Sequence, residues 1–76
     1  MRFPSKEEID KIRREYPVGT RVRLIYMDDF QAPPPGTMGT VRGVDDSGAL
    51  LMGWDTGGRL KVMLDEDEVE IVEEGQ

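Results

Sequence analysis

The sequence predicts a mainly β fold, a small closed barrel of five short strands that follows one N-terminal α-helix. Three observations favour it. Short runs alternate apolar with polar residues, glycine-containing turns separate these runs, and one long proline-rich loop follows the first run. A long loop followed by tight turns suggests an SH3-like barrel over residues 20–72. Closure would protect edges that a flat sheet of this size leaves open to aggregation.

A helix is expected over residues 6–16. Ser5 and Glu8 form the S-x-x-E pattern of a capping box, which satisfies free backbone N–H groups at a helix start. The apolar residues of this segment recur at three and four positions: Ile9, Ile12 and Tyr16. They form one narrow stripe that should lie on the sheet, and Pro17 ends the helix.

The first strand is expected over residues 21–27. Alternation places one set of its side chains inward: Val22, Leu24 and Tyr26. A polar loop follows over residues 28–35, and its three consecutive prolines favour polyproline II and cannot donate sheet hydrogen bonds. We therefore expect a stiff surface loop with one exposed aromatic residue, Phe30.

The central stretch, residues 33–58, predicts two strands joined by a tight turn. Its first half is rich in β-branched residues, and Asp45-Asp46-Ser47-Gly48 has the composition of a four-residue turn. The return strand over residues 49–55 places three apolar side chains on one face: Leu50, Met52 and Trp54. Asp55-Thr56-Gly57-Gly58 then forms a second turn.

Two further strands are expected over residues 59–64 and 69–72, separated by an acidic connection. The expected core is the set of inward apolar side chains from all five strands: Val22, Leu24, Val41, Val44, Leu50, Met52, Leu60, Val62, Val69 and Ile71. The helix stripe should cover one open end of the barrel.

Length and composition limit the function. With 76 residues the chain forms one domain, residues 1–76, which buries about 60% of its unfolded surface. It contains neither Cys nor His, which removes disulfides, the usual zinc sites and thiol or imidazole catalysis. Its two serines are assigned to a cap and a turn, so we expect no enzyme, no catalytic residue and no cofactor. No apolar run suits a signal peptide or a membrane span, so a cytoplasmic protein is expected.

The net charge of −6 is unevenly distributed. Residues 1–26 contain seven basic and four acidic residues, whereas residues 27–76 contain three basic and twelve acidic residues. Such an acidic half can simply keep the protein soluble. It can also face a basic surface of a protein partner, because complementary fields steer association.

Four spaced motifs occur in order: M-D-D, P-x-G-T-x-G-T-V, V-D-D-x-G and W-D-x-G. They lie in VRLIYMDD and in PPPGTMGTVRGVDDSGALLMGWDTGGRL. With them the chain resembles, over roughly residues 20–71, a bacterial and phage family of small domains of unknown function, DUF4314. The resemblance implies an SH3-like barrel and a frequent occurrence in phages and mobile elements, and it implies no established activity.

A candidate partner-binding surface combines aromatic, proline and acidic residues: Tyr26, Asp28, Asp29, Phe30, Pro33, Pro34, Trp54 and Asp55. Aromatic and proline side chains could form a groove like that with which SH3-type domains dock proline-rich peptides, and the two loop aspartates would receive an arginine. The alternative for Trp54 is an aromatic that packs in or at the rim of the core.

The sequence contains two further candidate sites. Basic residues near the junction of the helix and the first strand could contact nucleic-acid phosphates: Lys11, Arg14, Arg21 and Arg23. The twelve acids in the rest of the chain oppose this hypothesis. Acidic pairs could bind calcium or magnesium, but the run from Asp65 lacks the glycine and glutamate of an EF-hand loop. Solvated turns explain those pairs, so no metal site is expected.

Three functions follow. The first is a non-catalytic protein-interaction module, associated with a phage or mobile element, in the cytoplasm of a bacterial host cell. The second is a phage counter-defence factor that inhibits a host immune protein or sequesters a nucleotide signal. The third is a nucleic-acid-binding SH3-like domain. A pull-down from host lysate at two salt concentrations would show a salt-sensitive protein partner for the first two, and a nucleic-acid gel shift near physiological salt would support the third.

Overall fold

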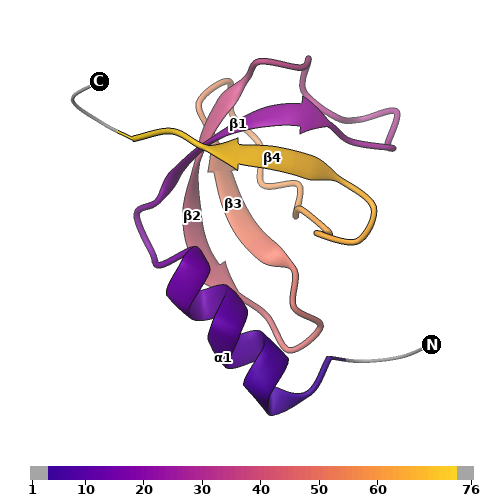
Figure 1. The fold of residues 1–76 in the computed structure, drawn as a ribbon. Coiled ribbons are helices and arrows are strands. Elements are labelled where there is room, and N and C mark those ends of the chain that lie inside the picture. The colour runs from indigo at the N-terminus through magenta and orange to yellow at the C-terminus, as the bar shows by residue number, and fades with distance from the viewer. Residues whose placement is uncertain (1–3, 74–76) are drawn as a thin grey trace.

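The computed structural model describes residues 4–73 and contains one α-helix and a single antiparallel sheet (Figure 1). The elements are α1, Lys6–Glu15, β1, Arg21–Tyr26, β2, Met38–Val44, β3, Leu50–Trp54, and β4, Glu68–Ile71. The order of strands in the sheet is β3-β2-β1-β4, so the last strand returns to pair with the first. The mainly β fold with an N-terminal helix is confirmed.

The helix begins where the capping motif predicts. The Oγ of Ser5 accepts a hydrogen bond from the backbone N–H of Glu8 at 3.1 Å. The helix ends at Glu15, one residue before the predicted end, and Tyr16 is its C-cap. Of the apolar stripe, Ile9 is buried, and the other residues pack partly against the core. Figure 1 shows α1 at one end of the sheet, where it packs against β2.

The first strand contains a bulge that alternation does not predict. Val22 and Leu24 are buried, as expected, but Tyr26 is 54% exposed, so its predicted inward orientation is wrong. The pairing of β1 with β4 shifts register between Leu24 and Tyr26. An extra residue in one strand reverses the side on which later side chains lie, and this turns Tyr26 outward.

A second bulge lies in the hairpin of β2 and β3. The register shifts between Val41 and Gly43, which allows Val41 and Val44 to be buried together although they are three residues apart. The turn that follows β2 is closed by Gly48, whose φ of 82° is readily adopted only by glycine. This hairpin was predicted correctly.

The predicted fourth strand is wrong in its extent. Within the described part of the chain there are four strands, and residues 59–64 contribute one bridge, in which Val62 exchanges backbone hydrogen bonds with Leu50. Backbone groups around this bridge bond to side chains instead of a neighbouring strand. The carbonyl of Leu60 accepts from the indole of Trp54, and the N–H of Met63 donates to an Asp67 carboxylate. The predicted fifth strand exists as β4. The strand pairings leave the sheet open, and the closed five-stranded barrel stays a prediction.

The core lies between the sheet, the helix and the segment around Val62. Its buried hydrophobic residues come from α1, β1, β2, β3, the turn before β3 and the bridging segment: Ile9, Val22, Leu24, Val41, Val44, Ala49, Leu50, Met52, Trp54 and Val62. Three predicted core residues differ. Leu60 and Val69 are half-buried, and Ile71 is 48% exposed because β4 is an edge strand near the end of the described chain.

Candidate protein-binding groove

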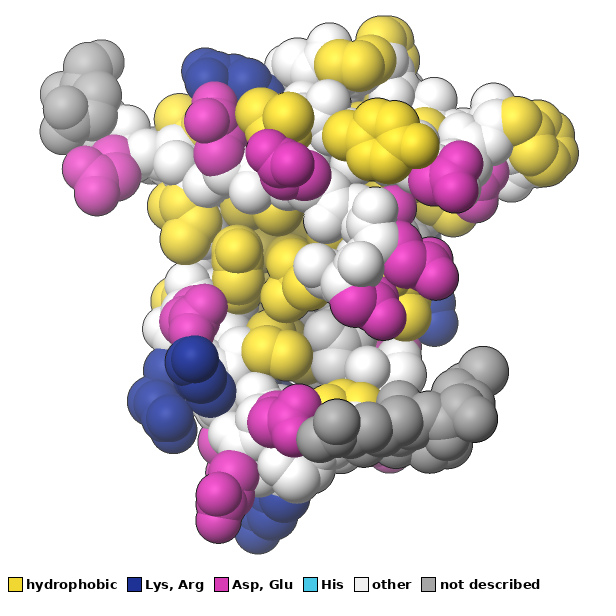
Figure 2. Space-filling view, turned by 45° about the vertical axis from the view of Figure 1, so that its right-hand side comes forward, with side chains coloured by type: hydrophobic (Ala, Val, Ile, Leu, Met, Phe, Trp, Pro, Cys, Tyr) yellow, Lys and Arg dark blue, Asp and Glu magenta, His cyan; other side chains and the backbone are white. Residues whose placement is uncertain are grey.

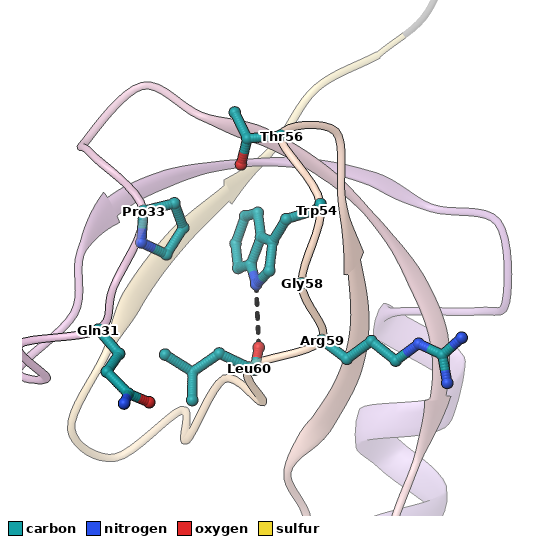
Figure 3. A pocket seen from close by; sticks show the side chains of 8 residues that line it. Gln31, Pro33, Trp54, Thr56, Gly58, Arg59 and Leu60 are labelled. Carbon is teal, nitrogen blue, oxygen red and sulfur yellow. Dashed lines mark hydrogen bonds between the residues drawn. The ribbon is translucent and has the colours of Figure 1, made fainter.

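An open pocket of about 480 Å³ lies between the proline-rich loop and the turn that follows β3 (Figure 3). We call it the Trp54 groove. The loop contributes Gln31 and Pro33, and the other residues belong to the end of β3 and to residues 56–60. Figure 3 shows Pro33 and Leu60 around the indole of Trp54, whereas the side chain of Arg59 extends away. The groove therefore joins segments more than twenty positions apart in the sequence.

Trp54 forms the floor of this groove and is itself 5% exposed. Its Nε1–H donates a 2.9 Å hydrogen bond to the carbonyl oxygen of Leu60. On its other side the ring lies on the backbone of Gly39, where an added Cβ would stand 2.6 Å from Cε3 of the ring. The interpretation of Trp54 as a packing aromatic therefore holds, and its N–H group is already engaged within the chain.

Glycines fix the turn that forms the wall of the groove. Gly57 and Gly58 have φ values of 94° and 95°, a conformation that L side chains rarely adopt. The N–H of Gly57 donates to the carbonyl of Trp54 at 2.9 Å, and the N–H of Trp54 donates to the carbonyl of Gly58 at 3.2 Å. This short closed turn brings Leu60 back over the indole.

The opposite wall is held by the loop's own hydrogen bonds. The carboxylate of Asp29 accepts from the N–H of Gln31 at 2.8 Å, and its carbonyl accepts from the N–H of Ala32 at 3.0 Å. Further along, the Thr37 hydroxyl donates to the carbonyl of Pro34 at 2.6 Å. The wall is thus ordered before any ligand arrives.

A second pocket of about 190 Å³ adjoins the groove, and Leu60 lines both. We call it the acidic pocket, because four acidic side chains line it: Asp28, Asp29, Glu66 and Asp67. The one basic residue in its lining, Lys61, already donates to the carboxylate of Asp45 at 3.1 Å. A cation on a bound partner would therefore find unbalanced negative charge here.

The structure brings together part of the predicted partner-binding set. Pro33 and Trp54 line the groove, and the two loop aspartates line the acidic pocket. Tyr26 and Phe30 are 54% and 96% exposed and line neither pocket, and Pro34 is exposed beside the groove wall. Asp55 is engaged elsewhere, as its ion pair shows.

Arg21 donates hydrogen bonds to both carboxylate oxygens of Asp55, from Nη1 at 2.8 Å and from Nη2 at 2.5 Å. Its Nη1 also donates to the hydroxyl of Thr40 at 2.8 Å. The hydrogen bond from Arg21 holds the pKa of Asp55 below its usual value. The pair links β1 to the residue that follows β3, across β2. Asp55 is therefore engaged within the sheet by Arg21.

The predicted nucleic-acid residues are largely paired with acids. Lys11 lies 3.7 Å from the Glu15 carboxylate, Arg23 pairs with Glu70, and Arg21 with Asp55. Arg14 is exposed on α1. These acids cancel much of the charge that a phosphate backbone would require. Among residues 4–73, no group of three or more acidic side chains is placed to hold a metal ion, and no helix is long and apolar enough to cross a membrane.

Sequence reasoning missed several residues of the two pockets: Met27, Gln31, Thr56, Arg59, Leu60, Met63, Glu66 and Asp67. Leu60 was expected in the core because strand alternation was extended through residues 59–64. The signal in the sequence that could have identified Leu60 as a groove residue was the Gly57-Gly58 pair. Two consecutive glycines indicate a tight turn, which brings the residues that follow it back beside Trp54.

The family comparison agrees with the motifs. A sequence model described as a domain of unknown function (DUF4314) matches residues 5–72. No curated protein matches the chain, and no solved structure matches it. The match covers the helix, all four strands and both pockets.

Proposed function

Because this chain belongs to the DUF4314 family, whose description names no activity, we propose its function from its surface: it is a non-catalytic module that binds an extended segment of a partner protein in the Trp54 groove. The observation that carries the proposal is the placement of Leu60 between an apolar groove and an acidic pocket. A segment with apolar residues followed by arginine or lysine fits both.

The groove favours an apolar segment because Pro33, Trp54 and Leu60 line it, and its floor and walls are already ordered by hydrogen bonds within the chain. Trp54 is packed on Gly39, and its N–H group is bonded to Leu60, so the indole is fixed and contributes its small exposed part to an apolar floor. A site that is ordered beforehand loses less conformational entropy when the ligand binds. Gln31 and Thr56 at the rim provide polar groups for the backbone of the segment.

The acidic pocket supplies charge complementarity. Four carboxylates line it, and Lys61 there is engaged by Asp45. A guanidinium or ammonium group makes charge-assisted hydrogen bonds to carboxylates, and a favourable field raises the association rate. The bound segment should therefore place a basic residue beside Leu60, on the side away from Trp54.

The non-catalytic part of the proposal is supported by the side chains present. The sequence contains no Cys or His, and both serine hydroxyls serve local structure. Ser5 caps α1, and the Ser47 hydroxyl donates to Asp45 at 2.6 Å. Each hydroxyl donates to a carboxylate of its own cap or turn, Ser5 to Glu8 at 3.4 Å and Ser47 to Asp45 at 2.6 Å, and the sequence has no histidine to act as a base.

The closed SH3-like barrel belongs to this proposal. Val62 pairs on the outer side of β3, and Glu68 begins β4 at the other edge of the sheet. In a flat sheet these positions would be about 19 Å apart. Six residues reach that far only when nearly fully extended, yet this link contains a turn closed by a 2.9 Å bond from Glu66 to Met63. Curling of the sheet accounts for this short link.

The biological setting is proposed as well. The phage or mobile-element association and the bacterial cytoplasm come from the resemblance and from sequence composition. The counter-defence hypothesis stays a prediction, since a groove for a partner segment suits an inhibitor of a host protein as well as an assembly module.

The test is a titration of ¹⁵N-labelled protein with two synthetic peptides, Leu-Pro-Leu-Arg-Arg and Leu-Pro-Leu-Glu-Glu. The basic peptide should shift the indole N–H resonance of Trp54 and the amide resonances of Gly57 and Gly58, and the acidic peptide should not. Asp28→Lys should raise the Kd of the basic peptide about threefold to fivefold at low salt.

The matched control is Asp46→Lys, which makes the same change of charge at an exposed position of the turn between β2 and β3. It should leave that Kd within about twofold. Absence of shifts at the groove with either peptide, or equal weakening by both variants, would overturn the proposal.

A further inference from the structure

We propose that the outer edge of β4 is a second binding surface, which accepts an extended segment of a partner protein as an additional strand with alternating basic and apolar residues. This surface is distinct from the Trp54 groove and does not depend on it. The inference rests on three features of β4: its unpaired backbone, its two chemically different faces, and the exposed apolar surface beside it.

The pairing of β4 with β1 shows which backbone groups are free. The N–H of Val72 donates to the carbonyl of Arg21 at 2.9 Å, and Arg23 lies opposite Glu70. In an antiparallel pair, alternate residues turn their N–H and C=O groups toward the neighbour. Val69 and Ile71 therefore turn theirs outward, and nothing in residues 4–73 pairs with that edge.

The other edge of the sheet is already covered. Leu50 of β3 exchanges backbone hydrogen bonds with Val62, at 2.9 and 3.0 Å, and the N–H of Trp54 bonds to Gly58. An exposed edge is the part of a sheet that pairs with another chain. The proposed curl brings the segment around Val62 toward β4, but no backbone hydrogen bond joins the two in residues 4–73, so β4 is the edge at which a strand can be added.

The two faces of β4 specify the residues of the added strand. Val69 and Ile71 lie opposite the buried Leu24 and Val22, so they belong to the core face. Glu68 and Glu70 lie on the opposite face; Arg23 already pairs with Glu70, so the exposed carboxylate of Glu68 is the one that a basic residue of the incoming strand would meet. Directly opposed residues on neighbouring strands interact, and opposite charges stabilise the pair. The incoming strand should therefore alternate apolar residues with lysine or arginine.

Exposed apolar surface lies next to this edge. Ile71 is 48% exposed, and Leu64, Val69 and Tyr16 are half-buried against the core. Figure 2 shows hydrophobic side chains gathered across the middle of that face, between the levels of β4 and α1. Apolar residues of an added strand would cover part of this surface and gain from its burial.

The chain itself contains one strand of the required pattern. β1 reads Arg-Val-Arg-Leu at its start and is the strand with which β4 already pairs. A second copy of β4 does not suit the edge, because its glutamates would lie opposite Glu68 and Glu70, and like charges directly opposed destabilise a pair. The occupant is therefore a basic segment of another protein.

The test uses three capped hexapeptides: (Lys-Val)₃, (Glu-Val)₃ and Lys₃Val₃. We expect (Lys-Val)₃ to slow hydrogen exchange at the amides of Val69 and Ile71 at least fivefold, and the other two peptides to change it less than twofold. Equal protection by Lys₃Val₃ would show attraction by charge without strand pairing and would overturn the proposal. Self-association of the free protein through the same amides would also overturn it.

Two variants test the edge. Ile71→Pro removes an outward N–H and leaves the hydrogen bonds to β1, so it should raise the Kd of (Lys-Val)₃ at least fivefold relative to Ile71→Val. Should the proline variant not fold, Glu68→Lys replaces it and should raise that Kd about threefold, with Asp46→Lys as the control. Asp28→Lys should leave binding at β4 unchanged, which separates this surface from the groove. Unchanged Kd in the edge variants would refute the proposal.

Discussion

The indole Nε1–H of Trp54 donates a 2.9 Å hydrogen bond to the backbone carbonyl oxygen of Leu60, six residues later. This bond closes the turn after β3 and determines the wall of the groove. It also explains why the segment after the turn is not a regular strand, since the Leu60 carbonyl is bonded to a side chain. One residue, Trp54, thus links the core to the candidate site.

Trp54→Phe tests this bond. Phenylalanine keeps an aromatic ring but has no N–H group, so the half-buried Leu60 carbonyl loses its partner. We expect the free energy of unfolding to fall by about 1–3 kcal/mol, measured by urea denaturation. The amide resonances of Gly57 and Gly58 should also shift. An unchanged free energy of unfolding would show that the bond adds nothing to stability.

Gly39→Ala tests the contact beneath the same ring. A Cβ at this position would lie 2.6 Å from Cε3 of Trp54, so the ring must move. We expect a loss of about 1–3 kcal/mol in the free energy of unfolding. Gly43→Ala is the matched control in the same strand, because its Cβ would lie 3.6 Å from the Leu51 side chain, an ordinary contact. Equal losses in both variants would assign the effect to the strand backbone.

Phe30→Ala tests whether the aromatic residue of the loop is structural. Its side chain is 96% exposed, and it lines neither pocket. Surface substitutions of this kind change stability by about 0.5 kcal/mol or less, so the melting temperature should remain nearly unchanged. Weaker binding of a partner would then be attributed to a direct contact by Phe30. A loss of several degrees would place it in the core.

Val41→Ala tests the core. Val41 is fully buried in β2, opposite Met52 of β3, so truncation should leave a small cavity. We expect a loss of about 2–3 kcal/mol in the free energy of unfolding. Val18→Ala removes the same atoms from a side chain that is 75% exposed and should cost about 0.5 kcal/mol or less. Similar losses in the two variants would contradict the observed burial.

Local patterns predicted most of the fold. The capping motif at Ser5 identified the start of α1, and alternation in β3 identified Leu50 and Met52 as core. These signals succeed because each depends on neighbouring residues alone. The predictions fail where a residue distant in the sequence determines the orientation of a side chain. Tyr26 turns outward because of a bulge against β4, and no local pattern specifies that bulge.

The candidate site was predicted only in part for the same reason. Pro33 and Trp54, which were chosen because prolines and aromatics have recognisable chemistry, line one pocket, and their role in binding stays a prediction. Leu60 was assigned to the core, since its position depends on a side-chain hydrogen bond from Trp54 and on the positive φ of Gly57 and Gly58. Asp55 was assigned to a partner although Arg21 engages it from another strand.

The carboxylate of Asp45 gives the last prediction, a dependence of stability on pH. Its pKa is lowered from 3.8 to about 2, chiefly by the hydrogen bond from the Ser47 hydroxyl and further by the Ala49 N–H and the Lys61 ammonium. The folded state therefore binds the proton less tightly than the unfolded chain does. The stabilisation is fully present above about pH 4 and is lost as the pH falls toward 2.

Asp45→Asn removes this charge and retains an oxygen that can accept from Ser47 and Ala49. Urea denaturation at pH values from 2 to 6 should show a flatter decline of stability at the acidic end than in the wild-type protein. Asp46→Asn, at the exposed neighbouring position, should keep the wild-type slope. The two variants remove the same charge from the same turn and differ only in which carboxylate is lost. If both flatten the dependence of stability on pH equally, overall charge, rather than the hydrogen bonds to Asp45, governs acid unfolding.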